Sequence, residues 1–288
     1  ETGSRALDGR SRFRASAAPA STGGEVAVRD AAQLPPLLER LTERQPEALD
    51  WLGVSYGFTP TLFRFWKRAG YTPLYIRQTA NELTGEYSTV QLKTLGANDA
   101  WLVAFASDFR RRFLALLSFR FRELSTTAAL SILEACSSAI AANDAEAVAR
   151  ASANMATPLT AAELHMQLSP FDLKRLEAYG NNMLDLGVVL DLLPVLASFY
   201  FARRLRVVVD DAGVEADASQ ELTVSGVSAA LLLGIGMQHK LIEDVVQELQ
   251  LPLSQAHALL AKAVRWIVKN LRGVERRAIA VSYTHLTL

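Results

Sequence analysis

The pattern of apolar and polar positions between residues 52 and 95 predicts a short capped helix followed by strands. The helix is expected to begin after Thr59, an N-cap residue type, with Pro60 at its first position, where proline is favoured. Its apolar positions recur at helical spacing and are Leu62, Phe63, Trp66 and Ala69. Gly70 follows, and glycine readily adopts the left-handed conformation that closes a helix.

Two runs rich in aromatic and β-branched residues, 71–78 and 87–95, predict the two strands, joined by a hairpin loop. In the second run, Val90 and Leu92 alternate with Thr89, Gln91 and Lys93, so the two sets face opposite sides of a sheet. The segment LGVSYG, before the helix, is expected to be a loop.

Helical patterns replace strand patterns beyond Gly96, so we predict a domain boundary there. Aromatic and leucine residues recur every four positions in the next segment: Trp101, Phe105, Phe109, Phe113, Leu117 and Phe121. Arg110, Arg111 and Arg112 flank this stripe. Arginine among aromatics can bind RNA through phosphate contacts and stacking. The alternative is a core helix whose arginines pair with acidic neighbours, and the pattern leaves both interpretations open.

Further helices are predicted towards the C-terminus. Ser169-Pro170 caps a long helix, and Pro194 is expected to end or kink it. After the break at Leu251-Pro252, a last helix carries cations every three or four residues: Lys262, Arg265, Lys269, Arg272 and Arg276. One row of cations suits a series of phosphates, although a solvated amphipathic face would give the same pattern.

Composition restricts these interpretations only mildly. The chain has 288 residues, half of them hydrophobic, which allows one or two domains with a sizeable core. Thirty basic and thirty acidic residues cancel, so any RNA-binding surface must be local. A single cysteine, Cys136, excludes an internal disulfide and a cysteine-built zinc site. The histidines share no metal-binding spacing, no apolar run is long enough to span a membrane, and no signal peptide is visible.

Whole segments of the chain resemble the RNA cytidine acetyltransferase family, in its eukaryotic nucleolar branch. The similar segments include LPPLLERL, RQPEALDWLGVSYGFTP, RFWKRAGYTPLYIRQTANELTGEYS, DFRRRFLALLSF, SPFDLKRLEAYGNNM and SAALLLGIGMQHK. The resemblance runs from about residue 34 to about residue 279. It implies an ATP-dependent enzyme that uses acetyl-CoA to form N4-acetylcytidine in 18S ribosomal RNA and transfer RNA, located in the nucleus and nucleolus.

The resemblance also assigns residues. Gly3 and Ser4 match the end of the family's acetyl-CoA pyrophosphate loop, where backbone N–H groups approach phosphate oxygens at a helix N-terminus. After Leu7 the sequence departs from the family, so a disordered leader is the alternative there. Arg68 is expected to contact acetyl-CoA, with a helix-end cation that meets only solvent as the alternative. No catalytic residue is assigned, because the family's proton-accepting groups would lie upstream.

Together these observations predict an α+β fold. We expect a leader over residues 1–30, the C-terminal part of a GNAT-like acetyltransferase domain over 31–96, a mostly helical RNA-binding domain over 97–280 and an unassigned tail over 281–288. The resemblance implies ribosomal and transfer RNA as partners, a tRNA-binding adaptor, a homodimer and ATP bound upstream. The chain alone is expected to be inactive. The alternatives are an RNA-binding module without catalysis and a protein N-acetyltransferase.

Overall fold

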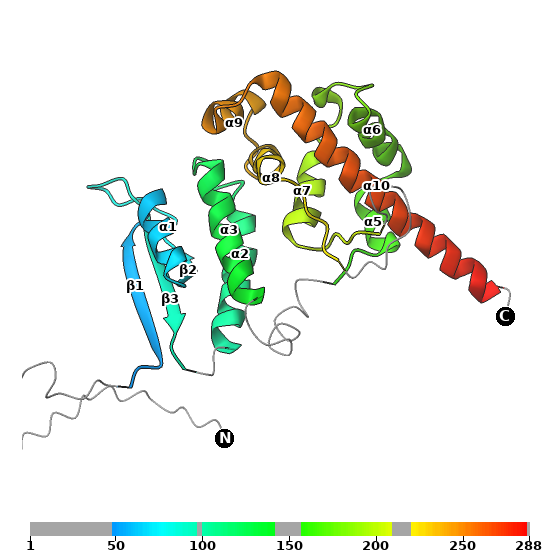
Figure 1. Ribbon diagram of the computed structural model, residues 1–288. Helices are drawn as coiled ribbons and strands as arrows, with labels where there is room; N and C mark the ends of the chain where they lie inside the picture. Colours follow the sequence, from blue (N-terminus) through cyan, green and yellow to red (C-terminus); the bar gives the residue numbers. More distant parts are fainter. Residues whose placement is uncertain (1–47, 97–99, 142–156, 209–219, 287–288) are drawn as a thin grey trace, which may run out of the picture. The chain divides into compact units, whose positions relative to one another are not determined.

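The computed structural model describes residues 48–96, 100–141, 157–208 and 220–286 (Figure 1). The described residues from Leu49 onwards belong to one compact unit. It combines a small antiparallel sheet with many helices, which confirms the α+β class. The elements are β1 (Trp51–Gly57), α1 (Pro60–Arg68), β2 (Thr72–Ile76), β3 (Ser88–Thr94), α2 (Ala100–Leu116), α3 (Thr126–Ala141), α5 (Ala161–Gln167), α6 (Pro170–Gly180), η2 (Leu186–Val188), α7 (Leu193–Phe201), α8 (Gly226–Leu232), η3 (Leu233–Met237), α9 (Ile242–Leu249) and α10 (Leu253–Leu286).

The sheet has the strand order β1-β3-β2, and β3 pairs antiparallel with both neighbours. The prediction of a loop for LGVSYG is wrong, because β1 pairs with β3 along its whole length, from Trp51 opposite Thr94 to Gly57 opposite Ser88. This strand forms through pairing with a segment more than thirty residues away, which local glycine content does not reveal. Glycine fits at position 53 because it has no side chain: an added Cβ would lie only 2.7 Å from the Leu92 side chain, which is too close.

The predicted capped helix is confirmed as α1. The Thr59 hydroxyl accepts a hydrogen bond from the Leu62 N–H at 3.3 Å, and Pro60 occupies the first turn. Gly70 has a φ of +83°, the left-handed conformation expected after the helix. Lys67, in the last turn, donates from Nζ to the Ser131 carbonyl and hydroxyl oxygens and to the Glu134 carboxylate on α3.

The helices beyond residue 100 share a large core. Its buried members include Phe113, Leu117, Leu173, Leu196 and Val264. The long helix expected after Ser169 stops at Gly180, and the prediction for Pro194 is wrong, because this proline lies in the first turn of α7 and starts a helix. The last helix, α10, continues to Leu286, into the segment that the sequence left unassigned.

Candidate nucleic-acid interface

The orientation of α10 is fixed by its apolar face. Residues at helical spacing along that face are buried in the core: Ala256, Leu260, Val264, Ile267, Val268 and Leu271. The cations between them are therefore held towards the opposite side, with Lys262, Arg265 and Arg276 exposed and Lys269 and Arg272 half-buried. Burial of the apolar face is what turns the periodic cations into a surface stripe.

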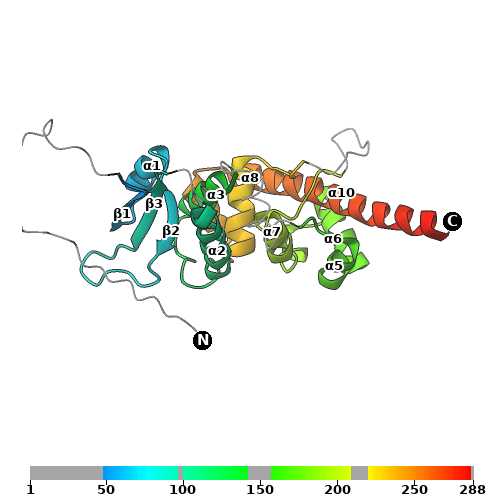
Figure 2. The ribbon, with the colours of Figure 1, turned by 90° about the horizontal axis from the view of Figure 1, so that it is seen from below.

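Helix α6 lies along α10 and forms the second wall of the site (Figure 2). A capping box starts α6: the Ser169 hydroxyl accepts from the Asp172 N–H, and the Asp172 carboxylate accepts from the Ser169 N–H. The hydrogen bond from Arg175 is the largest cause that holds the pKa of Asp172 at about 2. At its other end α6 closes on α10, because a Cβ on Gly180 would lie 3.0 Å from the Cα of Arg265.

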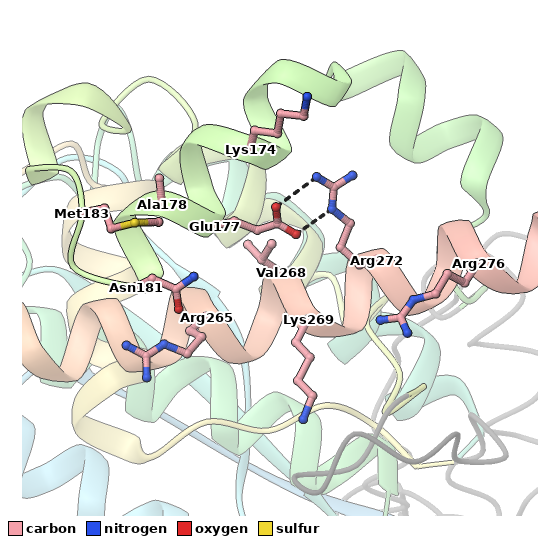
Figure 3. Close-up of a pocket in the computed structure, with 10 residues that line it drawn as sticks. All are labelled: Lys174, Glu177, Ala178, Asn181, Met183, Arg265, Val268, Lys269, Arg272 and Arg276. Carbon is pink, nitrogen blue, oxygen red and sulfur yellow. Dashed lines mark hydrogen bonds and ion pairs between the residues drawn. The ribbon is translucent and has the colours of Figure 1, made fainter.

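Between these helices lies a basic groove of about 430 Å³, which we call the α6–α10 groove (Figure 3). It is lined by Lys174, Glu177, Ala178, Asn181, Met183, Arg265, Val268, Lys269, Arg272 and Arg276. Five of these side chains are cations and one is an anion, so their formal charge is +4 in a chain whose net charge is zero. Four of the five cations predicted on the last helix thus line a groove: Arg265, Lys269, Arg272 and Arg276.

Two arginines of the groove are held by specific bonds. Arg265 donates from Nε to the Gly180 carbonyl oxygen at 2.6 Å, which anchors its side chain beside the end of α6. Arg272 donates to both Glu177 oxygens, at 2.8 and 3.2 Å, and to Glu275 at 2.9 Å. The hydrogen bonds to Glu177 are the largest cause that raises the pKa of Arg272.

The other predicted α10 cations differ in position. The Lys269 ammonium lies 5.7 Å from the centre of the Trp266 ring, within the range of a cation–π contact. Lys262 is exposed but is not among the residues that line the groove, one turn before Arg265. The sequence did not single out Glu177 or Asn181. Their spacing of three and seven residues from Lys174 places them on the same face of α6 and could have revealed them.

The three arginines of α2 separate into different environments. Arg110 is only 3% exposed, donates from Nε to the Ser137 hydroxyl at 3.1 Å, and its Nη1 finds no hydrogen-bond partner in the described parts of the chain. Burial lowers its pKa to about 10. Its assignment as an RNA contact is therefore corrected, because it faces the core. Arg111 is exposed and pairs with Asp108 at 2.7 Å, and Arg112 is exposed.

Comparison with known proteins relates the two halves of the chain to two domain families. Residues 6–96 match the family described as GNAT acetyltransferase 2, and residues 101–287, more than half of the chain, match the family described as "Possible tRNA binding domain". The chain belongs to the family of this tRNA-binding domain and is homologous to RNA cytidine acetyltransferases.

Three curated relatives illustrate this homology, all named RNA cytidine acetyltransferase. The Schizosaccharomyces pombe protein is 43% identical over 88% of this chain and 23% of its own length. The Homo sapiens protein is 42% identical over 85% of this chain and 22% of its own length, and the Saccharomyces cerevisiae protein 41% identical over 88% and 22%. The chain thus spans about a fifth of the length of the curated relatives it matches. The groove lies wholly in the part that matches the tRNA-binding domain.

The residues expected to contact acetyl-CoA belong to the GNAT match. Gly3 and Ser4 lie outside the described residues. Arg68 is exposed in the last turn of α1, as a ligand contact requires, whereas its neighbour Lys67 is held against α3. Cys136 is fully buried, and burial raises the pKa of its thiol to about 12, so it lacks the thiolate character of a nucleophile.

The described parts of the chain also bear on metal binding and on membrane insertion. In those parts no three histidine, cysteine, aspartate or glutamate side chains are grouped so that they could hold a metal ion. None of the described helices is both long enough and apolar enough to cross a membrane.

Proposed function

We propose that this chain is part of an RNA cytidine acetyltransferase, which transfers the acetyl group of acetyl-CoA to N4 of cytidine, and that its helical part holds the RNA. The observation that carries the proposal is the concentration of positive charge in the α6–α10 groove, within the tRNA-binding match. A basic groove attracts the phosphate backbone locally even when the whole chain is neutral. The names of the homologous enzymes supply the reaction.

The reaction sets the demands on the RNA-holding part. The exocyclic amine of cytidine is a weak nucleophile, so it must be oriented towards the acetyl group, and the developing oxyanion must be stabilised. The groove contributes to the first demand by fixing the RNA backbone. In this proposal Arg68 contacts a phosphate of acetyl-CoA, since an exposed guanidinium suits phosphate oxygens, and Gly3 and Ser4 contact the same molecule.

The proposal extends to features that rest on family resemblance alone. They are ATP dependence of the longer protein, 18S ribosomal RNA and transfer RNA as substrates, a tRNA-binding adaptor, a homodimer and residence in the nucleolus. Fluorescence microscopy of the tagged longer protein tests the last of these, and a diffuse cytoplasmic signal would contradict it.

Radiolabelled acetyl-CoA tests the reaction in the longer protein that contains this chain. The expected product is N4-acetylcytidine in a cytidine-containing RNA, identified after nuclease digestion. Acetylation of a lysine peptide without acetylation of RNA would instead favour a protein acetyltransferase.

Filter binding of this chain to RNA at several salt concentrations tests the proposal that the chain binds RNA. We expect log K to fall with log salt by about 0.7 per neutralised phosphate of a single strand. Absent or salt-independent binding would refute RNA binding by this chain.

Substitution of Arg68 tests the acetyl-CoA contact. In the longer protein, Arg68→Ala is expected to raise the dissociation constant of acetyl-CoA by roughly tenfold or more, because a hydrogen bond to a charged group is lost. Arg64→Ala is the matched control, since Arg64 is exposed one turn earlier on the same helix. Equal effects of the two substitutions, or no effect of Arg68→Ala, would remove the contact from the proposal.

A further inference from the structure

Among the described residues that line the α6–α10 groove, Glu177 is the one acidic side chain. Its carboxylate points from α6 towards Arg272 on α10 (Figure 3). An acidic group in a groove suited to phosphates lowers the attraction for them, so its presence requires an explanation beyond general charge.

Glu177 binds Arg272 in the way that a phosphate would. Its two oxygens accept from Nε and Nη2 of the same guanidinium, at 2.8 and 3.2 Å. Guanidinium groups bind carboxylates and phosphates through the same two-pronged geometry. The carboxylate of Glu177 therefore occupies the position on Arg272 that a phosphate group of an RNA backbone would take.

The two carboxylates that hold Arg272 differ in exposure. The Glu177 side chain is 42% exposed, whereas that of Glu275 is 14% exposed. Glu275 contacts Nη1, on the other side of the guanidinium, at 2.9 Å. Glu177 can thus turn into solvent while Glu275 keeps Arg272 in place, since an exposed ion pair contributes little to stability.

We propose that an RNA phosphate displaces Glu177 from Arg272 when RNA enters the α6–α10 groove, so that Glu177 is a counter-charge that weakens RNA binding. This inference rests on the proposed function, because it takes RNA as the occupant of the groove. Arg265, anchored on the Gly180 carbonyl, lies seven residues and so about 10 Å along the helix axis from Arg272. Lys269 lies between them in the sequence, so the exchanged phosphate belongs to a backbone that follows α10.

The test is the affinity of the full chain for a fluorescein-labelled single-stranded RNA, measured by fluorescence anisotropy at several salt concentrations. Glu177→Gln is expected to tighten binding by up to about fivefold, the factor that corresponds to the loss of a surface ion pair. It is also expected to steepen the plot of log K against log salt by up to about 0.7, because the Glu177 carboxylate freed by RNA in the unmodified chain holds a cation and so cancels the counterion release of one phosphate contact. Glu177→Asp keeps the net charge, but the aspartate side chain is too short to form both hydrogen bonds to Arg272. This variant is therefore expected to tighten RNA binding as well.

Two controls separate local exchange from general charge. Glu221→Gln removes the same charge from another two-pronged pair, with Arg203, outside the groove, and is expected to leave the salt slope unchanged. The gain from Glu177→Gln should vanish in an Arg272→Gln background. Circular dichroism establishes that each variant is folded. Equal gains for the two glutamine variants, or a gain that survives without Arg272, would overturn the exchange while RNA binding stands. Failure of the unmodified chain to bind RNA would overturn the proposed function and the exchange together.

Discussion

The buried guanidinium of Arg110 offers a prediction that separates a core role from an RNA contact. Arg110 is 3% exposed and has one hydrogen bond, to Ser137, with no carboxylate bound to it in the described residues. The substitution Arg110→Met keeps the length of the side chain and removes the charge. Replacement of a buried charge by an apolar side chain of similar volume is often neutral or stabilising.

The structure gives the size of the effect. Burial lowers the pKa of Arg110 from its ordinary value to about 10, and the corresponding penalty for the charged form is about 3 kcal/mol. Because both the folded and the unfolded pKa lie above neutral pH, this penalty is constant there and is relieved only as the pH rises above about 10. The lost hydrogen bond offsets about 2 kcal/mol. Arg110→Met is therefore expected to raise the free energy of unfolding by about 1 kcal/mol.

Urea unfolding followed by far-ultraviolet circular dichroism measures this change, and RNA affinity is measured in parallel. The expected result is a higher urea midpoint with an unchanged m-value and an unchanged RNA dissociation constant. Arg112→Met, at an exposed position of the same helix, is the control and should alter stability by less than about 0.5 kcal/mol. A loss of more than about 2 kcal/mol for Arg110→Met, or weaker RNA binding, would refute the reasoning.

Three other predictions concern the support of the groove and the core. Gln238 is fully buried and donates to the carbonyl oxygens of Phe121, Arg122 and Leu124. Gln238→Leu is expected to lower the free energy of unfolding by about 2 to 4 kcal/mol, measured by urea unfolding, because three hydrogen bonds from a buried side chain are lost. Gly180→Val should force α6 from α10, lower stability by about 2 kcal/mol and weaken RNA binding, whereas Gly187→Val, where space is open, should not. The stabilisation from Asp172, with its pKa at about 2, is present above about pH 4 and is lost as the pH falls towards 2, so Asp172→Asn should flatten the fall of melting temperature in that range.

Local sequence signals predicted where helices begin and end better than they predicted which segments pair with one another. Thr59, Pro60 and Gly70 fixed the ends of α1, because caps act over a few residues. The strand β1 was missed, since its ladder with β3 depends on a long-range contact. The prediction for Pro194 was wrong for a related reason. Proline is unfavourable inside a helix but favourable in its first turn. Because α6 already ends at Gly180, Pro194 lies in the first turn of a new helix, α7.

The alternation in β3 was predicted, but its period does not reveal which face is buried. Thr89 and Gln91 are fully buried, whereas Val90 and Leu92 are partly exposed. The Thr89 hydroxyl donates to the Tyr75 carbonyl oxygen at 3.1 Å. A hydrophobicity pattern would have placed the apolar pair inside. Burial of the polar face depends on contacts with other elements, such as the Thr89 hydrogen bond to β2, which no pattern within β3 describes.

The prediction of RNA-binding residues has the same limit, because burial depends on elements far away in the sequence. Arg110 and Arg272 both lie beside apolar stripes in the sequence, and both were predicted as RNA contacts. Their surroundings differ, because α3 covers Arg110 through Ser137, whereas α6 leaves Arg272 partly exposed and presents Glu177 to it. A cation can reach a phosphate only where the residues packed around it leave it accessible. Those neighbours lie 27 and 95 residues away in the chain. Helical spacing therefore predicts which cations share a face of a helix, but the packing of other helices determines which of those cations are accessible to RNA.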